Sequence, residues 1–414
     1  MRRIFKLIAQ YLLLFVLTIF LLEGSLRGIN KLVPGLLFKP PLKLKLDYAD
    51  TRRKESMGLG PGGYLQENFD ALVNDAYGGA VRWKNNAQGF RNNYDVAPQP
   101  PKGVIRIMSL GDSFTAGYRL GQDETFSSRL ERFFNGKADG NTYEVLVSCI
   151  EEPATGLYYL NQYGTSFHPH FVLLGITLGN DIAQVYISLD PLGTYILDDS
   201  TADILPKASR PLGFKHGLEN KLIPGSCIDE KKKPRRSFVS RFVTFRLLKT
   251  VFNKRHSGES ISSWYGDKEK PRLFDPCNAL GQYLKEPPQE ILDSYERLFR
   301  VINAFKTVAV KNHFGFAAVI FPQRFQVQRE DWECTVSDYR LNEACFDLTK
   351  PNKLLTNFCA QNGILCIDPT AALAAAYAEK QESLFCPRGD MHLNAQGNRI
   401  LFEAIKDTLY RATR

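Results

Sequence analysis

The stretch that decides the fold is VIRIMSLGDSFTAG, residues 104–117. Its first half is apolar and rich in β-branched residues, which predicts a buried strand. The strand breaks at Gly111, and Ser113 follows two residues later. Open α/β folds keep their chemistry at the carboxyl edge of the sheet, where such a turn lies. Ser113 is therefore a candidate nucleophile, provided that a histidine reaches it.

Two distant stretches support this interpretation. FVLLGITLGND, residues 171–181, is another apolar strand ending in a polar turn that contains Asn180. GDMHLN, residues 389–394, precedes a final amphipathic segment. These three motifs, in this order, resemble those of the SGNH (GDSL-type) hydrolases, and more closely of bacterial members with an N-terminal membrane helix. The resemblance covers residues 85–410, with a divergent middle.

The order of segments predicts an α/β fold. Strands near residues 104–110, 143–147, 171–177, 314–321 and 364–367 are separated by helical patterns. Such alternation implies a central parallel sheet with right-handed crossovers. Together with the resemblance, it predicts the three-layer SGNH-hydrolase fold over residues 101–414, with an insertion at about 184–285 that could carry a hairpin near residues 195–205. Residues 28–100 are expected to form an irregular connector, because prolines and glycines punctuate them.

Three residues are the candidate catalytic residues. A serine hydroxyl is a poor nucleophile until a base takes its proton, and His392 is the expected base for Ser113. Asp390 is expected to orient His392 and to stabilise its imidazolium. In the family the commoner spacing is Asp-x-x-His, so the single Met391 between Asp390 and His392 is a departure. It calls either for an adjusted loop or for a smaller contribution from Asp390.

The resemblance also implies an oxyanion hole built from three donors. They are the backbone N–H of Ser113, the side-chain amide of Asn180 and the N–H of a glycine after the second strand. Relatives carry Asn-x-Gly-x-x-Gly there, whereas this chain reads VSCIEEPATG at residues 147–156. Gly156 is the expected donor, with the N–H of Cys149 or Glu152 as the alternative. The family implies no metal and no organic cofactor.

The N-terminus predicts a membrane anchor. Arg2, Arg3 and Lys6 precede an almost wholly apolar run at residues 7–22, nearly long enough to cross a bilayer. A cleaved signal peptide is the alternative, but the following residues form a poor cleavage site. Residues 1–27 are therefore expected to be a single-pass signal anchor in the inner membrane. By the positive-inside rule, the catalytic domain would face the periplasm or the cell exterior.

The charge of the chain favours an anionic surface as a partner. The formal net charge is +9, and no nucleic-acid motif accompanies it. Aromatic and leucine residues recur at helical spacing over residues 237–255 among basic ones, as in helices that lie on a bilayer. This segment could make a second membrane contact or pack against the hydrolase core. The role of the 184–285 insertion stays open between a lid, a membrane contact and a partner surface.

The eight cysteines leave the compartment undecided. No close Cys-x-x-Cys pair is present, which argues against a zinc site. In an oxidising compartment, the pairs to test first are Cys334–Cys345 and Cys227–Cys277.

These observations predict a membrane-anchored, outward-facing serine esterase. Its expected substrates are O-acetyl esters of an envelope or exported glycan, or a lipid acyl ester. A polysaccharide O-acetyltransferase with the same serine, histidine and aspartate is the first alternative. The second is a degenerate, non-catalytic SGNH domain in envelope assembly, which the altered glycine loop would favour.

Overall fold

The protein is built around one parallel sheet. The computed structural model describes residues 66–75, 77, 79–189, 195–206, 223–229, 280–387 and 390–414, with Thr18, Leu21 and Ser25. Its main sheet has five strands in the order β4-β3-β5-β8-β9, all parallel. The strands are β3 (Val104–Gly111), β4 (Thr142–Cys149), β5 (Phe171–Thr177), β8 (Gly315–Phe321) and β9 (Leu365–Ile367). The α/β architecture predicted from the sequence is confirmed.

Both faces of the sheet are buried, because successive side chains of each strand point to opposite sides. Along β8, Ala318 and Ile320 belong to one apolar core, whereas Ala317, Val319 and Phe321 belong to the other. Strands covered on both faces read as continuous apolar runs rather than alternating ones. This explains why the strands were recognisable in the sequence.

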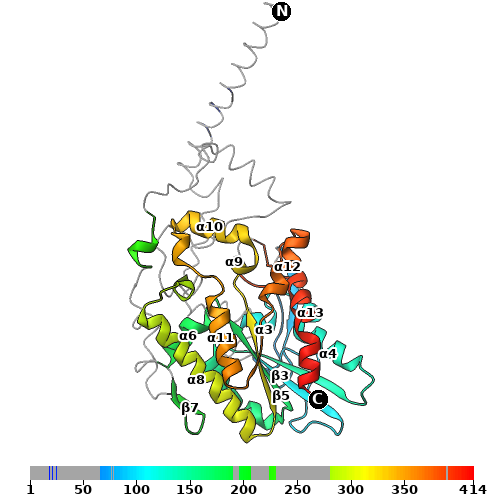
Figure 1. Ribbon diagram of the computed structural model, residues 1–414. Coiled ribbons are helices and arrows are strands. Elements are labelled where there is room, and N and C mark those ends of the chain that lie inside the picture. Colours follow the sequence, from blue (N-terminus) through cyan, green and yellow to red (C-terminus); the bar gives the residue numbers. More distant parts are fainter. Residues whose placement is uncertain are drawn as a thin grey trace, which may run out of the picture.

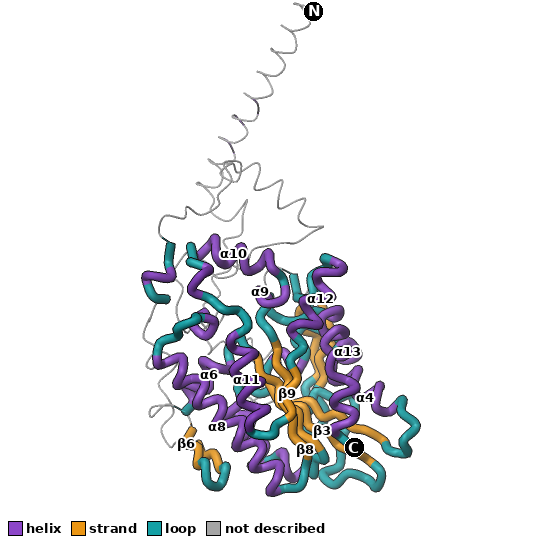
Figure 2. Tube along the Cα trace, viewed as in Figure 1, coloured by secondary structure: helices purple, strands orange, loops and turns teal. Residues whose placement is uncertain are grey.

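Helices cover each face, as Figures 1 and 2 show. One core is closed by α5 (Pro153–Gln162), α6 (Asp181–Ser188), α8 (Gln289–Lys311) and α11 (Lys350–Gln361). The other is closed by α4 (Phe126–Asn135), α12 (Thr370–Lys380) and α13 (Ala395–Ala412). Further helices join these elements: α3 (Ser113–Ala116), η1 (Gln122–Glu124), η2 (Gly164–Phe167), η6 (Leu280–Tyr283), α9 (Arg324–Val327) and α10 (Arg329–Tyr339).

The segment before the sheet is more ordered than the sequence suggested. Within the expected irregular connector, β1 (Asp70–Asn74) and β2 (Ala80–Lys84) form an antiparallel hairpin. Its turn is held by Asp75, which accepts hydrogen bonds from the N–H groups of Tyr77 and Gly79 at 2.8 and 2.7 Å. The prediction failed here because two five-residue strands, half exposed, carry little periodic signal.

The insertion is described only in part. The expected hairpin is present as β6 (Tyr195–Asp198) and β7 (Asp203–Pro206), which pair antiparallel. The predicted basic helix at residues 237–255 lies outside the described residues, as does nearly all of the predicted anchor at residues 1–27. Among the residues that are described, no helix is both long and apolar enough to cross a membrane.

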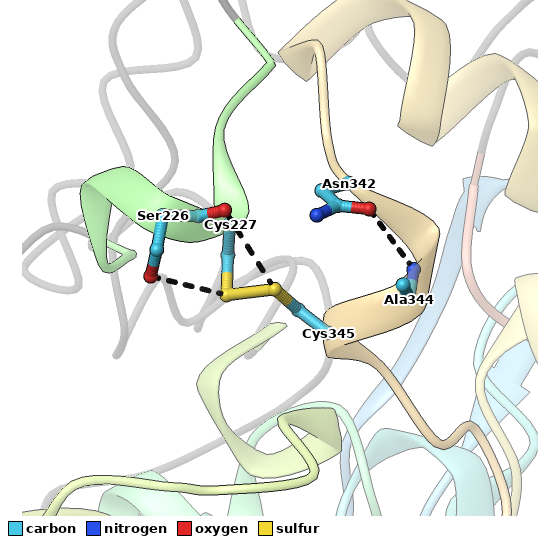
Figure 3. Close-up of a disulfide and its surroundings, with 5 residues drawn as sticks. All are labelled: Ser226, Cys227, Asn342, Ala344 and Cys345. Atoms are coloured by element: carbon cyan, nitrogen blue, oxygen red, sulfur yellow. Dashed lines mark hydrogen bonds between the residues drawn. A yellow bond between two sulfur atoms is a disulfide. The ribbon is translucent and has the colours of Figure 1, made fainter.

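A disulfide joins the insertion to the main domain (Figure 3). It links Cys227 in η3 (Gly225–Cys227) to Cys345 in η7 (Glu343–Cys345), with a Cα–Cα distance of 5.7 Å. The N–H of Asn342 donates to the carbonyl of Cys227 at 2.9 Å, so the backbones already meet there. The expected pairs Cys334–Cys345 and Cys227–Cys277 are therefore wrong, because the fold brings together cysteines 118 residues apart. Cys334 is a free thiol in α10.

Candidate active site

The candidate site forms where β3 ends. β3 lies between β4 and β5, so the chain leaves it in one direction for β4 and the sheet continues on the other side with β5. Such a switch point opens a crevice at the carboxyl edge of a parallel sheet. Ser113 is the first residue of α3 there, capped by the side chain of Asp112, which accepts from the N–H of Phe114 at 2.9 Å. The serine is thus presented at the edge, as the sequence predicted.

Two glycines let α3 lie close against the sheet. A Cβ at Gly111 or at Gly175, on the neighbouring strand β5, would collide with the hydroxyl of Thr115. The Thr115 side chain therefore occupies the space that these two missing side chains leave. Replacing either glycine would push α3, and with it Ser113, away from the edge of the sheet.

The structure brings the three predicted catalytic residues together. The Oγ of Ser113 lies 2.7 Å from Nε2 of His392, although 279 residues separate them in the sequence. The Nδ1 of His392 lies 2.6 Å from Oδ1 of Asp390. Both separations are hydrogen-bond distances. The order serine, imidazole and carboxylate is the arrangement of a serine nucleophile with its base and orienting acid.

In the short loop Asp390-Met391-His392, one carboxylate oxygen of Asp390 contacts both the backbone and the ring of His392. Oδ1 of Asp390 accepts from both the backbone N–H of His392, at 3.0 Å, and its ring. Oδ2 lies 2.8 Å from Nε of Arg119. Burial raises the pKa of the Asp390 carboxyl, but the charges and hydrogen bonds of His392 and Arg119 outweigh it and lower that pKa to about 2. Asp390 is thus held as an anion.

A second arginine fixes the backbone of this loop. Nη1 of Arg324 donates to the carbonyls of Cys386 and Asp390, at 2.9 and 3.4 Å. Its Nε pairs with Asp331 at 2.6 Å, and all of these groups are buried. The loop that carries the base is therefore anchored to α9 and α10. At its far end Asn394 caps α13 by accepting from the N–H of Gly397 at 2.9 Å.

Asn180 is positioned from the serine side. Its Nδ2 donates to Oδ2 of Asp112 at 3.2 Å, and Asp112 also accepts from the Thr177 hydroxyl at 2.9 Å. A carboxamide nitrogen carries two hydrogens, so one remains for a ligand. The N–H of Ser113 is at the first position of a helix, where an N–H has no intrahelical partner. Asn180 is thus hydrogen-bonded to Asp112, and Ser113, the other predicted donor, directly follows Asp112 in the chain.

The structure excludes Gly156 as the third predicted donor, whereas the alternative, the N–H of Cys149 or Glu152, stays a prediction. Gly156 is buried inside α5, where its N–H donates to the carbonyl of Glu152 at 3.0 Å. Glu152 caps this helix, and its carboxylate accepts from the N–H groups of Ala154 and Thr155 at 2.7 and 2.8 Å. Glu152 and Pro153 form a capped start that places Gly156 inside the helix. Gly156 is therefore removed from the candidate donors.

Sequence reasoning missed the arginine that supports the serine turn. Arg91 is buried, and its guanidinium donates to the carbonyls of Ala116, Gly117 and Leu120 around the end of α3. It also lies over the ring of Trp83, 3.8 Å from the centroid. Arg91 follows Phe90, which is buried in the core.

Arg119 was missed as well, because no motif marks it and its partner Asp390 lies far away in the sequence. Among the described residues, no group of three or more histidine, cysteine, aspartate or glutamate side chains is arranged to hold a metal ion. Cys149, at the end of β4, is buried next to Trp83 and Ala116.

Comparisons with known proteins give only distant matches. No protein-family model and no curated protein matches this chain. An acetyl xylan esterase of known structure is 11% identical, with 74% of this chain and 100% of that chain covered and a TM-score of 0.35. An acetylxylan esterase from Geobacillus stearothermophilus is 10% identical, with 75% and 94% covered and a TM-score of 0.36. TesA is 10% identical, with 73% and 97% covered and a TM-score of 0.33.

Proposed function

We propose that this protein is a serine ester hydrolase. The observation that carries the proposal is the contact of Ser113 Oγ with His392 Nε2 at 2.7 Å and of His392 Nδ1 with Asp390 Oδ1 at 2.6 Å. Asp390 stays ionised, which favours the tautomer with the proton on Nδ1 and leaves Nε2 free to accept. His392 is then ready to take the proton of Ser113.

The reaction follows from this arrangement. Ser113 Oγ attacks the ester carbonyl while its proton passes to His392, and Asp390 stabilises the imidazolium. His392 then protonates the departing alcohol, which leaves an acyl-serine. Water, deprotonated by His392, releases the acid. The oxyanion of each tetrahedral intermediate accepts from the Ser113 N–H and from the second hydrogen of Asn180 Nδ2.

The proposed substrates are O-acetyl esters of an envelope or exported glycan, or lipid acyl esters. The support is the motif resemblance to anchored SGNH hydrolases and the basic charge of the chain, +9. Acetate release from acetylated xylan, compared with hydrolysis of p-nitrophenyl esters of increasing chain length, tests this. Preference for acetyl groups favours the glycan, and preference for long acyl chains favours a lipid.

We also propose that the site faces outward from a membrane anchor at residues 1–27. The Cys227–Cys345 disulfide supports an oxidising compartment, where such bonds persist. Arg2, Arg3 and Lys6 before the apolar run support the orientation. Resistance of the chain to alkaline extraction from membranes, with protease access from the periplasmic side, is the expected result. Release on alkaline extraction would contradict it.

The decisive experiment measures p-nitrophenyl acetate turnover by the full chain in detergent. Ser113→Ala and His392→Ala are expected to lower kcat/KM by roughly 10⁴-fold or more. Ser166→Ala and His168→Ala are matched controls, because both residues are exposed just before β5, at the opposite edge of the sheet. Equal activity of the Ser113 variant and the controls would overturn the proposal.

A further inference from the structure

Arg119 makes one contact that the reaction as written does not use. Its Nε lies 2.8 Å from Oδ2 of Asp390, whose side chain is only 5% exposed. No aligned hydrogen bond is formed by this Nε, so the contact acts through charge. The opposite face of the carboxylate, Oδ1, is already occupied by the backbone and ring of His392. Arg119 therefore faces the one oxygen of Asp390 that the histidine leaves open.

The position of Arg119 is fixed by contacts with Tyr118 and with the turn between β1 and β2. The N–H of Tyr118 donates to the carbonyl of Ser113 at 2.9 Å, so the loop folds back on the nucleophile. The Tyr118 ring meets the His392 ring edge-on at 5.0 Å, and the Arg119 guanidinium lies 5.2 Å from the centre of the Tyr118 ring. Arg119 also donates to the carbonyl of Asp75, in the β1–β2 turn, at 3.3 Å.

The backbone of Arg119 is in a conformation that disfavours its own residue type. Its φ is 68°, in the left-handed region that glycine or asparagine adopts most easily. Holding a long side chain there costs free energy, and such residues concentrate at functional sites. A glycine would suit the turn but would leave Oδ2 of Asp390 without a cation. The strain and the ion pair are independent observations on one residue.

Several charged groups lie near His392, and Arg119 differs from the others in the group with which it pairs. His392 interacts electrostatically with Asp112, from the end of β3, and with Asp390 from its own loop. The Cys386 thiol faces Asp390, Arg119 and Arg324, and burial first raises its pKa. Arg324 is already paired with Asp331. Among the described residues, Arg119 is thus the arginine that forms an ion pair with the side chain of Asp390.

We propose that Arg119 is a positioning residue that sets the pH range in which His392 acts as a base. This rests on the proposed serine hydrolase function. An imidazolium at His392 is attracted by Asp390 and repelled by Arg119. The arginine therefore limits how strongly Asp390 holds a proton on the ring, and so keeps His392 free to accept one at lower pH.

The first readout is the pH dependence of kcat/KM for p-nitrophenyl acetate with the full chain. In Arg119→Met, the acid limb is expected to move up by about one pH unit, because one nearby positive charge is lost. Arg119→Lys keeps the charge, so its acid limb is expected at the same pH as in the wild type. Arg119→Gln removes only the charge and carries the test if the methionine variant does not fold. Arg82→Met, which breaks the exposed Arg82–Asp70 pair, is the control.

The second readout does not need activity. The chain has six histidines, and the NMR signals of the His392 ring are identified as those lost in His392→Gln. Their titration midpoint is expected to rise in Arg119→Met and Arg119→Gln, and to stay near the wild-type position in Arg119→Lys and Arg82→Met. An unmoved midpoint in both neutral variants overturns the proposal. Inactivity of wild type together with a moved midpoint would instead reject the esterase function and keep the role of Arg119.

Discussion

The pKa values of buried aspartates are shifted in opposite directions on the two sides of Ser113. On the histidine side, Asp390 is ion-paired, and its pKa is lowered to about 2. On the serine side, Asp112 and Asp181 are equally buried, but burial raises the pKa of both, and the charge of Asp112 raises that of Asp181 further. At similar depths of burial, neighbouring charges and hydrogen bonds outweigh desolvation at Asp390 and fall short of it at Asp112 and Asp181.

Arg91 extends this contrast to a cation. It is buried on the serine side, contacts backbone carbonyls rather than a carboxylate, and burial lowers its pKa to about 9. Arg119 and Arg324, on the histidine side, each pair with an aspartate. Both arginines on the histidine side are therefore compensated by a carboxylate, while Arg324 and Arg91 each hold backbone carbonyls in place.

The largest effect is expected from Asp390→Asn. The amide cannot stabilise the imidazolium and favours the wrong tautomer, so kcat should fall by about 10⁴-fold, as in serine-protease triads. Asp181→Asn is the matched control, with the same change in a carboxyl on the other side, and should stay within about tenfold. Steady-state kinetics on p-nitrophenyl acetate measures both. Equal losses would remove the distinction between the two sides.

The next effect is on stability. Arg91→Met leaves the carbonyls of Ala116, Gly117 and Leu120 without their donor. Since each buried polar group left unpaired costs about 1–3 kcal/mol, the free energy of unfolding should fall by about 4 kcal/mol. Urea titration followed by circular dichroism measures it. Arg82→Met, on the exposed hairpin, should change that free energy by less than about 0.5 kcal/mol, and a similar loss there would contradict the assignment.

Asn180→Ala is expected to reduce kcat by about 10²–10³-fold with little change in KM, because its amide acts on the oxyanion and not on the ground state. Asn161→Ala removes the same side chain from α5, where it donates to the carbonyl of Ala202 at 3.0 Å. That control should keep the wild-type kcat. A loss confined to KM in the Asn180 variant would place its amide on the bound ester instead.

The smallest effect is in the pH dependence of stability, with opposite signs on the two sides. The raised pKa of Asp181 means that its stabilising contribution is present at low pH and is lost as pH rises above about 4, the unfolded value. The lowered pKa of Asp390 means that its contribution is present above about 4 and is lost as pH falls toward about 2.

Melting temperatures of three proteins test these signs. Compared with wild type, Asp181→Asn should lose less stability between about pH 4 and 7, and Asp390→Asn should lose less below about pH 4. Parallel curves for all three proteins would show that neither carboxyl is shifted by its surroundings.

The sequence predicted those parts of the fold that are marked by a local pattern of apolar and polar residues. Continuous apolar strands marked the sheet, and the polar ends of two of them marked Ser113 and Asn180. The motif before the final helix marked Asp390 and His392, and the structure brings all four residues to one region. The roles of these residues remain predictions for the experiments above.

What the sequence did not reveal depends on contacts between distant segments. Arg91 and Arg119 act on residues that only folding brings near, and the partner of Cys227 lies 118 residues away. Gly156 was assigned from a family spacing that the capped start of α5 shifts. Local patterns carry no record of these pairings, because they depend on tertiary packing.

The separation of Ser113 and His392 by 279 positions in the sequence has a consequence for synthesis. Ser113 follows the first strand of the main sheet, whereas Asp390 and His392 come after its last strand, just before α13. A nascent chain therefore carries a serine without its proposed base until all five strands have been made. A chain cut between β9 and Asp390 would keep the whole sheet and lack that base.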